Sequence, residues 1–91
     1  MNILFSKTAW EQYLNWQKED AKVVERIHEL LKAVQRDPFK GVGKPEPLRQ
    51  NLKDYWSRKI NTEHRLVYRI VGKQHEGQRI EVLTCRYHYK K

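Results

Sequence analysis

The sequence predicts an α+β domain in which a strand, two helices and three strands follow one another, with both helices packed on one face of a mostly antiparallel sheet. Three observations support this fold class. An apolar stripe with helical spacing runs through residues 20–36, hydrophobicity alternates with a period of two after residue 55, and prolines and glycines separate these regions. The 91 residues leave room for one domain, 1–91, with a modest core.

The N-terminal part predicts a short strand followed by a helix. Residues 2–5 are expected to form the strand, and Ser6 or Thr8 is a candidate N-cap for a helix that runs to about Glu19. Five residues of this segment follow helical spacing: Ala9, Trp10, Tyr13, Leu14 and Gln17.

A second helix is expected to begin near Asp20 and to end before Asp37. Its apolar side chains recur along one stripe: Val23, Val24, Ile27, Leu30, Leu31 and Val34. The next segment, 38–48, holds all three prolines and two of the four glycines, so we expect an irregular loop with a restricted backbone. Such loops often present functional side chains.

The C-terminal part predicts three strands, most simply an antiparallel meander. They are expected at residues 56–61, 65–71 and 79–89, separated by a turn at 62–63 and a turn region at 72–77. In the middle strand, one face carries Leu66, Tyr68 and Ile70, while the other carries Arg65, Val67 and Arg69. One face is therefore expected to be largely core and the other charged. The sequence leaves open where the first strand pairs.

The net charge of +8 is concentrated in one half of the chain. Residues 1–39 hold six basic and six acidic side chains, whereas residues 40–91 hold thirteen basic and five acidic ones. This division indicates a scaffold half and an electropositive half, which suits nucleic acid or an acidic protein partner. Charge alone does not decide between these partners.

The single cysteine, Cys85, excludes an intrachain disulfide framework and indicates a reducing compartment. The apolar stretch at residues 3–5 is far shorter than the core of a signal peptide, and no later segment approaches a membrane span. We therefore expect a soluble cytoplasmic protein with no membrane partner.

No metal ion or other cofactor is expected. Ligand spacings such as CxxC or HExxH are absent, and so is a phosphate-binding GxxxxGK[ST] loop. Surface positions without a chemical role are favoured for His28 and His75, and a core position is favoured for Cys85. Any phosphate would have to be held by side chains.

Three stretches could carry chemistry: residues 44–48, 56–68 and 85–89. Together they supply a carboxylate, several guanidinium groups, an imidazole and phenols. Cleaving RNA without a metal needs a base for the 2′-OH proton, cations for the charge that develops on phosphate, and an acid for the leaving oxygen. Each stretch by itself is weak support, because such residues more often cover a sheet or pack in a core.

The motifs GKPEPL, WSR, EHRLVY and CRYHY, in this order and spacing, closely resemble the YoeB family of toxins, which belongs to the RelE-like superfamily. The similarity covers nearly the whole chain. It implies a microbial RNase-like fold and an mRNA interferase that cleaves messages in the ribosomal A site. Two features differ from the family's usual pattern: Lys90 and Lys91 follow the terminal aromatic pair, and the 72–77 hairpin is longer.

The resemblance also implies roles for individual residues. Glu46 corresponds to the general base, Arg65 to the clamp on the phosphate and its transition state, and His88 to the general acid, while Tyr89 orients the substrate or stacks on a base. The reverse assignment, with His88 as the base, stays open. Four cations resemble the family's supporting rim, which grips phosphates or ribosomal RNA: Lys44, Arg49, Arg58 and Lys59.

The partners implied by the resemblance are an acidic, YefM-like antitoxin and the ribosome with its mRNA; a homodimer is left open. Three alternatives compete with a nuclease. The chain could be a toxin of the same fold that binds DNA gyrase, a basic RNA-binding module, or a basic domain occupied only with an acidic partner. A purely binding toxin has no reason to keep Glu46, Arg65 and His88 together.

Overall fold

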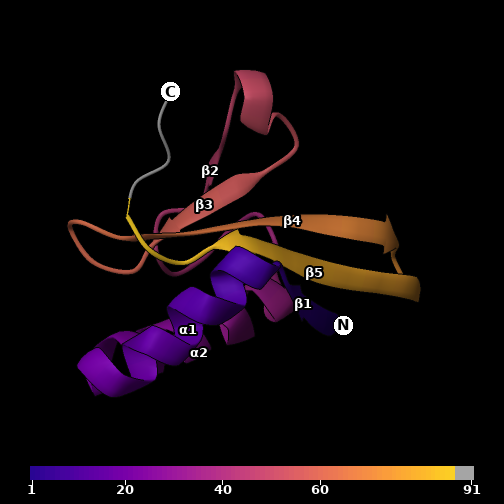
Figure 1. Ribbon diagram of the computed structural model, residues 1–91. Coiled ribbons are helices and arrows are strands. Elements are labelled where there is room, and N and C mark those ends of the chain that lie inside the picture. Colours follow the sequence, from indigo (N-terminus) through magenta and orange to yellow (C-terminus); the bar gives the residue numbers. More distant parts are fainter. Residues whose placement is uncertain (88–91) are drawn as a thin grey trace.

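The computed structural model describes residues 1–87, which form a five-stranded sheet with two helices against one face (Figure 1). Chain order gives β1 (Asn2–Phe5), α1 (Lys7–Glu19), α2 (Ala21–Arg36), β2 (Glu46–Pro47), the 3-10 helix η1 (Gln50–Leu52), β3 (Trp56–Lys59), β4 (Arg65–Lys73) and β5 (Glu76–Thr84). The strands lie in the order β1-β5-β4-β3-β2. The predicted α+β architecture is confirmed.

Capping residues fix where the helices begin. Ser6, rather than Thr8, is the N-cap of α1: its hydroxyl accepts a hydrogen bond from the first turn at 3.0 Å and donates one to the Leu83 carbonyl at 2.7 Å. The cap therefore also ties α1 to β5. Asp20 ends α1 and caps α2, so a single residue connects the two helices, which pack against each other. Neither helix is long and apolar enough to cross a bilayer within the described part of the chain.

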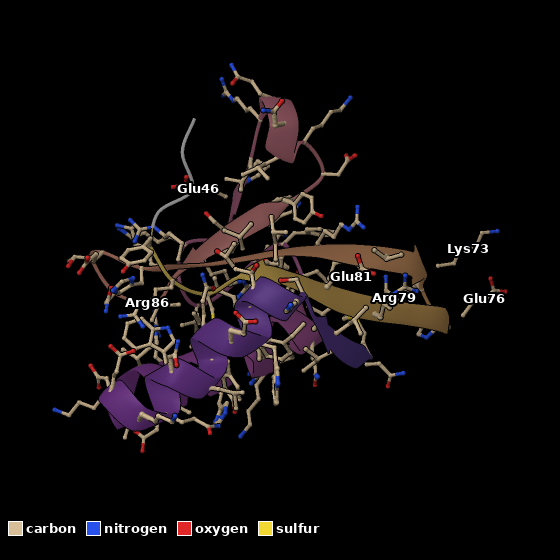
Figure 2. The ribbon with its side chains drawn as sticks, viewed as in Figure 1. Glu46, Lys73, Glu76, Arg79, Glu81 and Arg86 are labelled. Carbon is tan, nitrogen blue, oxygen red and sulfur yellow. The ribbon has the colours of Figure 1, made fainter. Side chains whose placement is uncertain are left out.

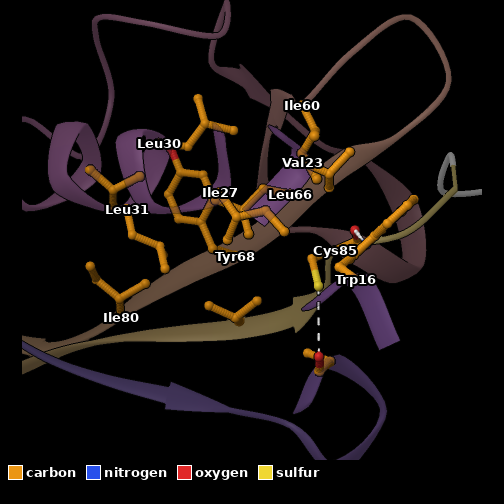
Figure 3. Close-up of a cluster of buried hydrophobic side chains, with 13 residues drawn as sticks. Trp16, Val23, Ile27, Leu30, Leu31, Ile60, Leu66, Tyr68, Ile80 and Cys85 are labelled. Carbon is orange, nitrogen blue, oxygen red and sulfur yellow. Dashed lines mark hydrogen bonds between the residues drawn. The ribbon is translucent and has the colours of Figure 1, made fainter. Parts of the chain in front are cut away.

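The core lies between the helices and the sheet (Figure 3). The predicted stripe of α2 contributes five buried residues: Val23, Ile27, Leu30, Leu31 and Val34. The helix α1 adds Ala9 and Trp16, and the strands add Leu66, Tyr68, Ile80 and Val82. Burying each large aliphatic side chain contributes about 1.5–3 kcal/mol, so this layer holds the sheet rigidly from one side.

The sheet is mixed, although most of its pairings are antiparallel. The strands β3, β4 and β5 form the predicted meander, and β1 pairs in parallel with β5, which the sequence did not settle. The middle strand alternates as predicted for Leu66 and Tyr68, which face the core. On the other face Val67 is also buried, so that face is less uniformly charged than expected.

Three boundaries differ from the predictions. The last strand was expected to reach residue 89 but ends at Thr84, because the chain bends at residues 86 and 87. The turn expected at 72–77 is reduced to two residues, since β4 runs to Lys73 and β5 starts at Glu76. The loop expected at 38–48 ends in β2, which pairs with β3; a proline fits there because β2 is an edge strand.

Candidate active site

The face of the sheet opposite the helices carries three of the candidate residues. Glu46 lies opposite Ser57 in the β2–β3 pairing, Ser57 lies opposite Val67 in the β3–β4 pairing, and Lys59 lies opposite Arg65. Residues opposite each other, or two apart on one strand, share a face. Glu46, Lys59 and Arg65 therefore project from three neighbouring strands on the same side of the sheet.

Glu46 is exposed on the edge strand between two prolines. In Figure 2 it lies on the side of the sheet away from the helices, at the end remote from Lys73 and Glu76 in the β4–β5 hairpin. Its edge position leaves the carboxylate accessible to solvent and to a large ligand.

The loop before Glu46 is fastened to β3. The Lys59 N–H donates a hydrogen bond of 2.7 Å to the carbonyl of Gly43. A side chain at Gly43 would have its Cβ 2.7 Å from Leu30 and 3.0 Å from Arg58, and its φ is +89°, so only glycine fits there. The exposed Lys44 follows with φ of 51°, and Arg49 lies exposed just before η1.

Arg65 is half-buried and fixed by the turn between β3 and β4. Its Nη1 donates to the carbonyls of Asn61 at 2.8 Å, His64 at 3.1 Å and Thr62 at 3.4 Å. Its backbone N–H donates to the carbonyl of Tyr87 at 3.2 Å. The position of the guanidinium is thus defined before any substrate binds, which suits a phosphate clamp.

Arg58 does not belong to the cationic rim. It is 0% exposed and faces the core, where its Nε donates to the Tyr68 hydroxyl at 3.0 Å. Its terminal nitrogens donate to the carbonyls of Val42, Asp37 and Lys40 at 2.7–3.0 Å. The prediction that Arg58 binds phosphate is therefore wrong, because its buried guanidinium is hydrogen-bonded to the loop that leads to Glu46.

The segment after β5 is held against α1 by hydrogen bonds. Trp16 donates through Nε1 to the carbonyl of Cys85 at 2.9 Å. Arg86 forms two hydrogen bonds with Glu19, at 2.6 and 3.0 Å, and lies over the Trp16 ring. These hydrogen bonds lower the pKa of the Glu19 carboxyl and raise that of the Arg86 guanidinium, so both stay ionised.

The described chain ends at Tyr87, beside Arg65. Two predicted catalytic residues, His88 and Tyr89, and the Lys90-Lys91 extension lie outside the described residues. Of the predicted site residues that are described, Glu46, Lys59 and Arg65 share one face, Lys44 and Arg49 flank the edge strand exposed, and Arg58 is buried.

His64 was not singled out by the sequence as a site residue. It is buried, and its Nδ1 accepts the Tyr87 N–H at 2.7 Å. The only signal in the sequence was its position next to Arg65 in EHRLVY. Burial of an imidazole depends on tertiary contacts that spacing does not reveal.

Two other features bear on the chemistry. Burial raises the pKa of the Cys85 thiol to about 12, so this cysteine is inert as a nucleophile. Within residues 1–87, no three His, Cys, Asp or Glu side chains are grouped so that they could hold a metal ion.

Comparison with known proteins identifies the family. The sequence pattern of the family described as "YoeB-like toxin of bacterial type II toxin-antitoxin system" matches residues 5–89. The chain belongs to the YoeB toxin family. The resemblance inferred from the motifs is thus confirmed.

Individual relatives of the family agree over nearly their full length. Toxin YoeB of Synechocystis sp. is 48% identical over 91 residues and covers 100% of both chains. A solved structure titled "YoeB/ParE toxin from Agrobacterium tumefaciens" has a TM-score of 0.92 at 47% identity, covering 98% of this chain and 100% of that one.

Assemblies of the family are known from Staphylococcus aureus. A YoeB-YefM complex has a TM-score of 0.86 at 44% identity, and a YoeB dimer has one of 0.87 at 46%; each comparison covers 98% of both chains. At 18% identity, YafQ from E. coli still has a TM-score of 0.73 over 96% of this chain and 92% of that one, which shows the RelE-like fold alone.

Proposed function

We propose that the chain is a ribosome-dependent endoribonuclease that cleaves mRNA in the ribosomal A site and so stops translation. The observation that supports this best is the convergence of three strands and the C-terminal segment. Glu46 and Arg65 share one exposed face with Lys59, and Tyr87, the residue before His88, is hydrogen-bonded to Arg65.

The proposed reaction is a transfer of phosphate to the neighbouring 2′-OH. Glu46 takes the 2′-OH proton as the oxygen attacks phosphorus, and His88 donates a proton to the leaving 5′ oxygen. A bond forms between O2′ and phosphorus, and the bond between phosphorus and O5′ breaks. The products are a 2′,3′-cyclic phosphate and a 5′-hydroxyl end. The reverse assignment, with His88 as the base, gives the same products.

Arg65 is proposed to stabilise the charge that develops on the phosphate oxygens. Its guanidinium is already held by the turn carbonyls, so little reorganisation is needed when the transition state forms. Tyr89 is proposed to orient the substrate or to stack on a base. With positive charge supplied by side chains, the proposed reaction needs no metal ion.

Lys44, Arg49 and Lys59 are proposed to grip RNA phosphates around the site. All three are exposed, and they flank Glu46 and Arg65 in the chain or in the sheet. The single domain, residues 1–91, offers little surface area for binding an mRNA by itself. The ribosome is therefore proposed to supply most of the grip on the substrate, in the cytoplasm.

An acidic, YefM-like antitoxin is proposed as the partner that silences this chain. The relative from Staphylococcus aureus has been solved in complex with YefM, and the excess of thirteen basic over five acidic residues in 40–91 suits an acidic segment. A homodimer is proposed as a second assembly, by analogy with the dimeric relative.

Primer extension on a translating message tests the proposal. Wild type should cut within the A-site codon, whereas Glu46→Ala and His88→Ala should lose cleavage. The matched controls are Glu76→Ala and His75→Ala, which remove the same groups from exposed positions of the β4–β5 hairpin. In Figure 2, Glu76 lies at the end of the sheet remote from Glu46. Arrested translation without any cut, or full cutting by both site variants, would refute the proposal and favour a toxin that acts by binding.

A further inference from the structure

His64 contacts two parts of the site that lie at the same end of the sheet: Arg65, at the start of β4, and the segment that follows β5. Its ring contacts the rings of Trp16 and Tyr87. The ring centroids of His64 and Trp16 are 4.8 Å apart in an edge-on arrangement, and those of His64 and Tyr87 are 5.4 Å apart. Only 8% of its side chain is exposed. An imidazole in such surroundings needs partners for its nitrogens, because an unpaired polar group is costly to bury.

The hydrogen bonds of the ring define its protonation pattern. The Nδ1 receives the N–H of Tyr87 at 2.7 Å, so this nitrogen must carry a lone pair. The Nε2 lies 3.5 Å from a carboxylate oxygen of Glu63, toward which it can direct its proton. The neutral ring with hydrogen on Nε2 therefore satisfies both neighbours.

The backbone of His64 contacts the guanidinium of Arg65. Its carbonyl accepts a hydrogen bond from Nη1 of Arg65 at 3.1 Å and one from the Ile60 N–H at 3.0 Å. Its own N–H donates to the side chain of Asn61 at 2.8 Å. One residue thus contacts the guanidinium of Arg65 through its carbonyl and the C-terminal segment through its ring.

Both backbone polar groups of Tyr87 are hydrogen-bonded. Its N–H donates to the His64 ring and its carbonyl accepts the N–H of Arg65. Its φ is +64°, a left-handed conformation that a tyrosine rarely adopts without such support. These two hydrogen bonds fix the N–H and the carbonyl of Tyr87, the last described residue, relative to His64 and Arg65.

We propose that His64 is a positioning residue, whose neutral ring aligns the C-terminal segment bearing the general acid with the guanidinium of Arg65. The inference rests on the proposed nuclease function and adds a device by which the site is assembled. A histidine that merely filled the core would need only its shape, whereas a positioning residue needs the acceptor on Nδ1.

Two substitutions separate these roles. In His64→Asn, the amide oxygen can take the place of Nδ1 and accept the Tyr87 N–H, whereas His64→Leu fills similar space without an acceptor. At saturating toxin on programmed ribosomes, we expect His64→Leu to lower the single-turnover rate roughly 100-fold, with unchanged ribosome affinity. His64→Asn should retain most of the rate. The matched control is His28→Leu, which removes an exposed histidine from α2 and should behave as wild type.

A readout independent of cleavage accompanies the rates. In wild type, the nitrogen NMR signals of His64 should show an unprotonated Nδ1, and the Tyr87 amide should exchange slowly with solvent. Equal rates for the Leu variant and wild type, equal losses in both variants, or a protonated Nδ1 in wild type would overturn the inference. If His64→Leu does not fold, the NMR signals of wild type and the rate of His64→Asn still decide. Absence of cleavage by wild type would instead refute the proposed function.

Discussion

Arg58 and Lys59 are neighbours on β3 but point to opposite faces of the sheet. Arg58 is completely buried among the carbonyls of residues 37–42, whereas Lys59 is exposed opposite Arg65. The two neighbouring cations of the motif WSRK therefore differ in role: Arg58 binds the loop carbonyls inside the fold, whereas Lys59 is free to meet a ligand at the surface. Their separation also explains how the loop before Glu46 is held in place.

Replacing Arg58 with Met should lower the free energy of unfolding by about 3 kcal/mol, because three partly buried loop carbonyls and the buried Tyr68 hydroxyl would lose a donor. Chemical denaturation measures this loss. Lys59→Ala should leave stability within about 0.5 kcal/mol of wild type and should reduce the salt dependence of ribosome binding instead. A stable Arg58→Met protein would contradict the structural role given to this guanidinium.

Arg65→Ala should slow single-turnover cleavage by about 3 kcal/mol, roughly 100-fold, because one clamp on the developing charge is lost. Arg65→Lys should recover only part of the rate, since an ammonium group lacks the planar fork of a guanidinium. Rates on programmed ribosomes test both variants. Full activity of Arg65→Ala would remove this residue from the site.

Gly43→Ala should destabilise the fold by about 3 kcal/mol and should also reduce cleavage. The added Cβ would meet Leu30 at 2.7 Å, and the backbone is left-handed at this position. Gly77→Ala is the matched control, because its φ of +71° is also strained but no atom lies within 4 Å of the added carbon. That variant should lose only about 1 kcal/mol and keep its activity. Thermal unfolding and cleavage assays distinguish them; equal losses would contradict the close packing at Gly43.

Glu81 provides a test by pH. Its carboxylate accepts hydrogen bonds from Arg69 at 2.8 Å and from Arg79 at 2.9 Å, which hold its pKa below the usual value. Stability from a lowered carboxyl pKa is present above the ordinary value of about 4.3 and is lost as the pH falls through the folded pKa. Glu81→Gln should thus unfold at a lower temperature than wild type at pH 7, and the gap should close in acid.

The control for this test is Glu76→Gln, an exposed carboxylate in the same hairpin. It should unfold like wild type at both pH values. Melting curves followed by circular dichroism give the comparison, and a gap for Glu81→Gln that is independent of pH would show that the two ion pairs do not stabilise the fold.

The parts of the fold that the sequence predicted depend on local patterns. The stripe of α2, the N-cap of α1 at one of two candidates (Ser6 or Thr8) and the alternation in β4 each arise from neighbours along the chain, so their periodicity or capping chemistry is visible before folding. The end of β5 could not be predicted, because Cys85, Arg86 and Tyr87 continue the alternation of apolar and polar side chains that is typical of a strand. These residues leave the strand at a bend, where side chains distant in the sequence, among them Trp16, Glu19 and His64, hydrogen-bond to them.

The sequence placed on one face of the sheet those candidate residues whose side chains are exposed or half-buried. Glu46, Lys59 and Arg65 lie in motifs and share a face as a sheet allows, whereas the fates of Arg58 and His64 depended on tertiary contacts. Burying a guanidinium requires carbonyls from a distant loop, and no spacing in the sequence encodes that requirement.

The ends of the cut message test the proposed chemistry most directly. RNA cleaved on programmed ribosomes by wild type should carry a 2′,3′-cyclic phosphate and a 5′-hydroxyl, as mapped by end-specific ligation, and Glu46→Ala should produce few such ends. A 3′-hydroxyl and a 5′-phosphate as the first products would show that the 2′-OH is not the nucleophile and would contradict the roles proposed for Glu46, Arg65 and His88.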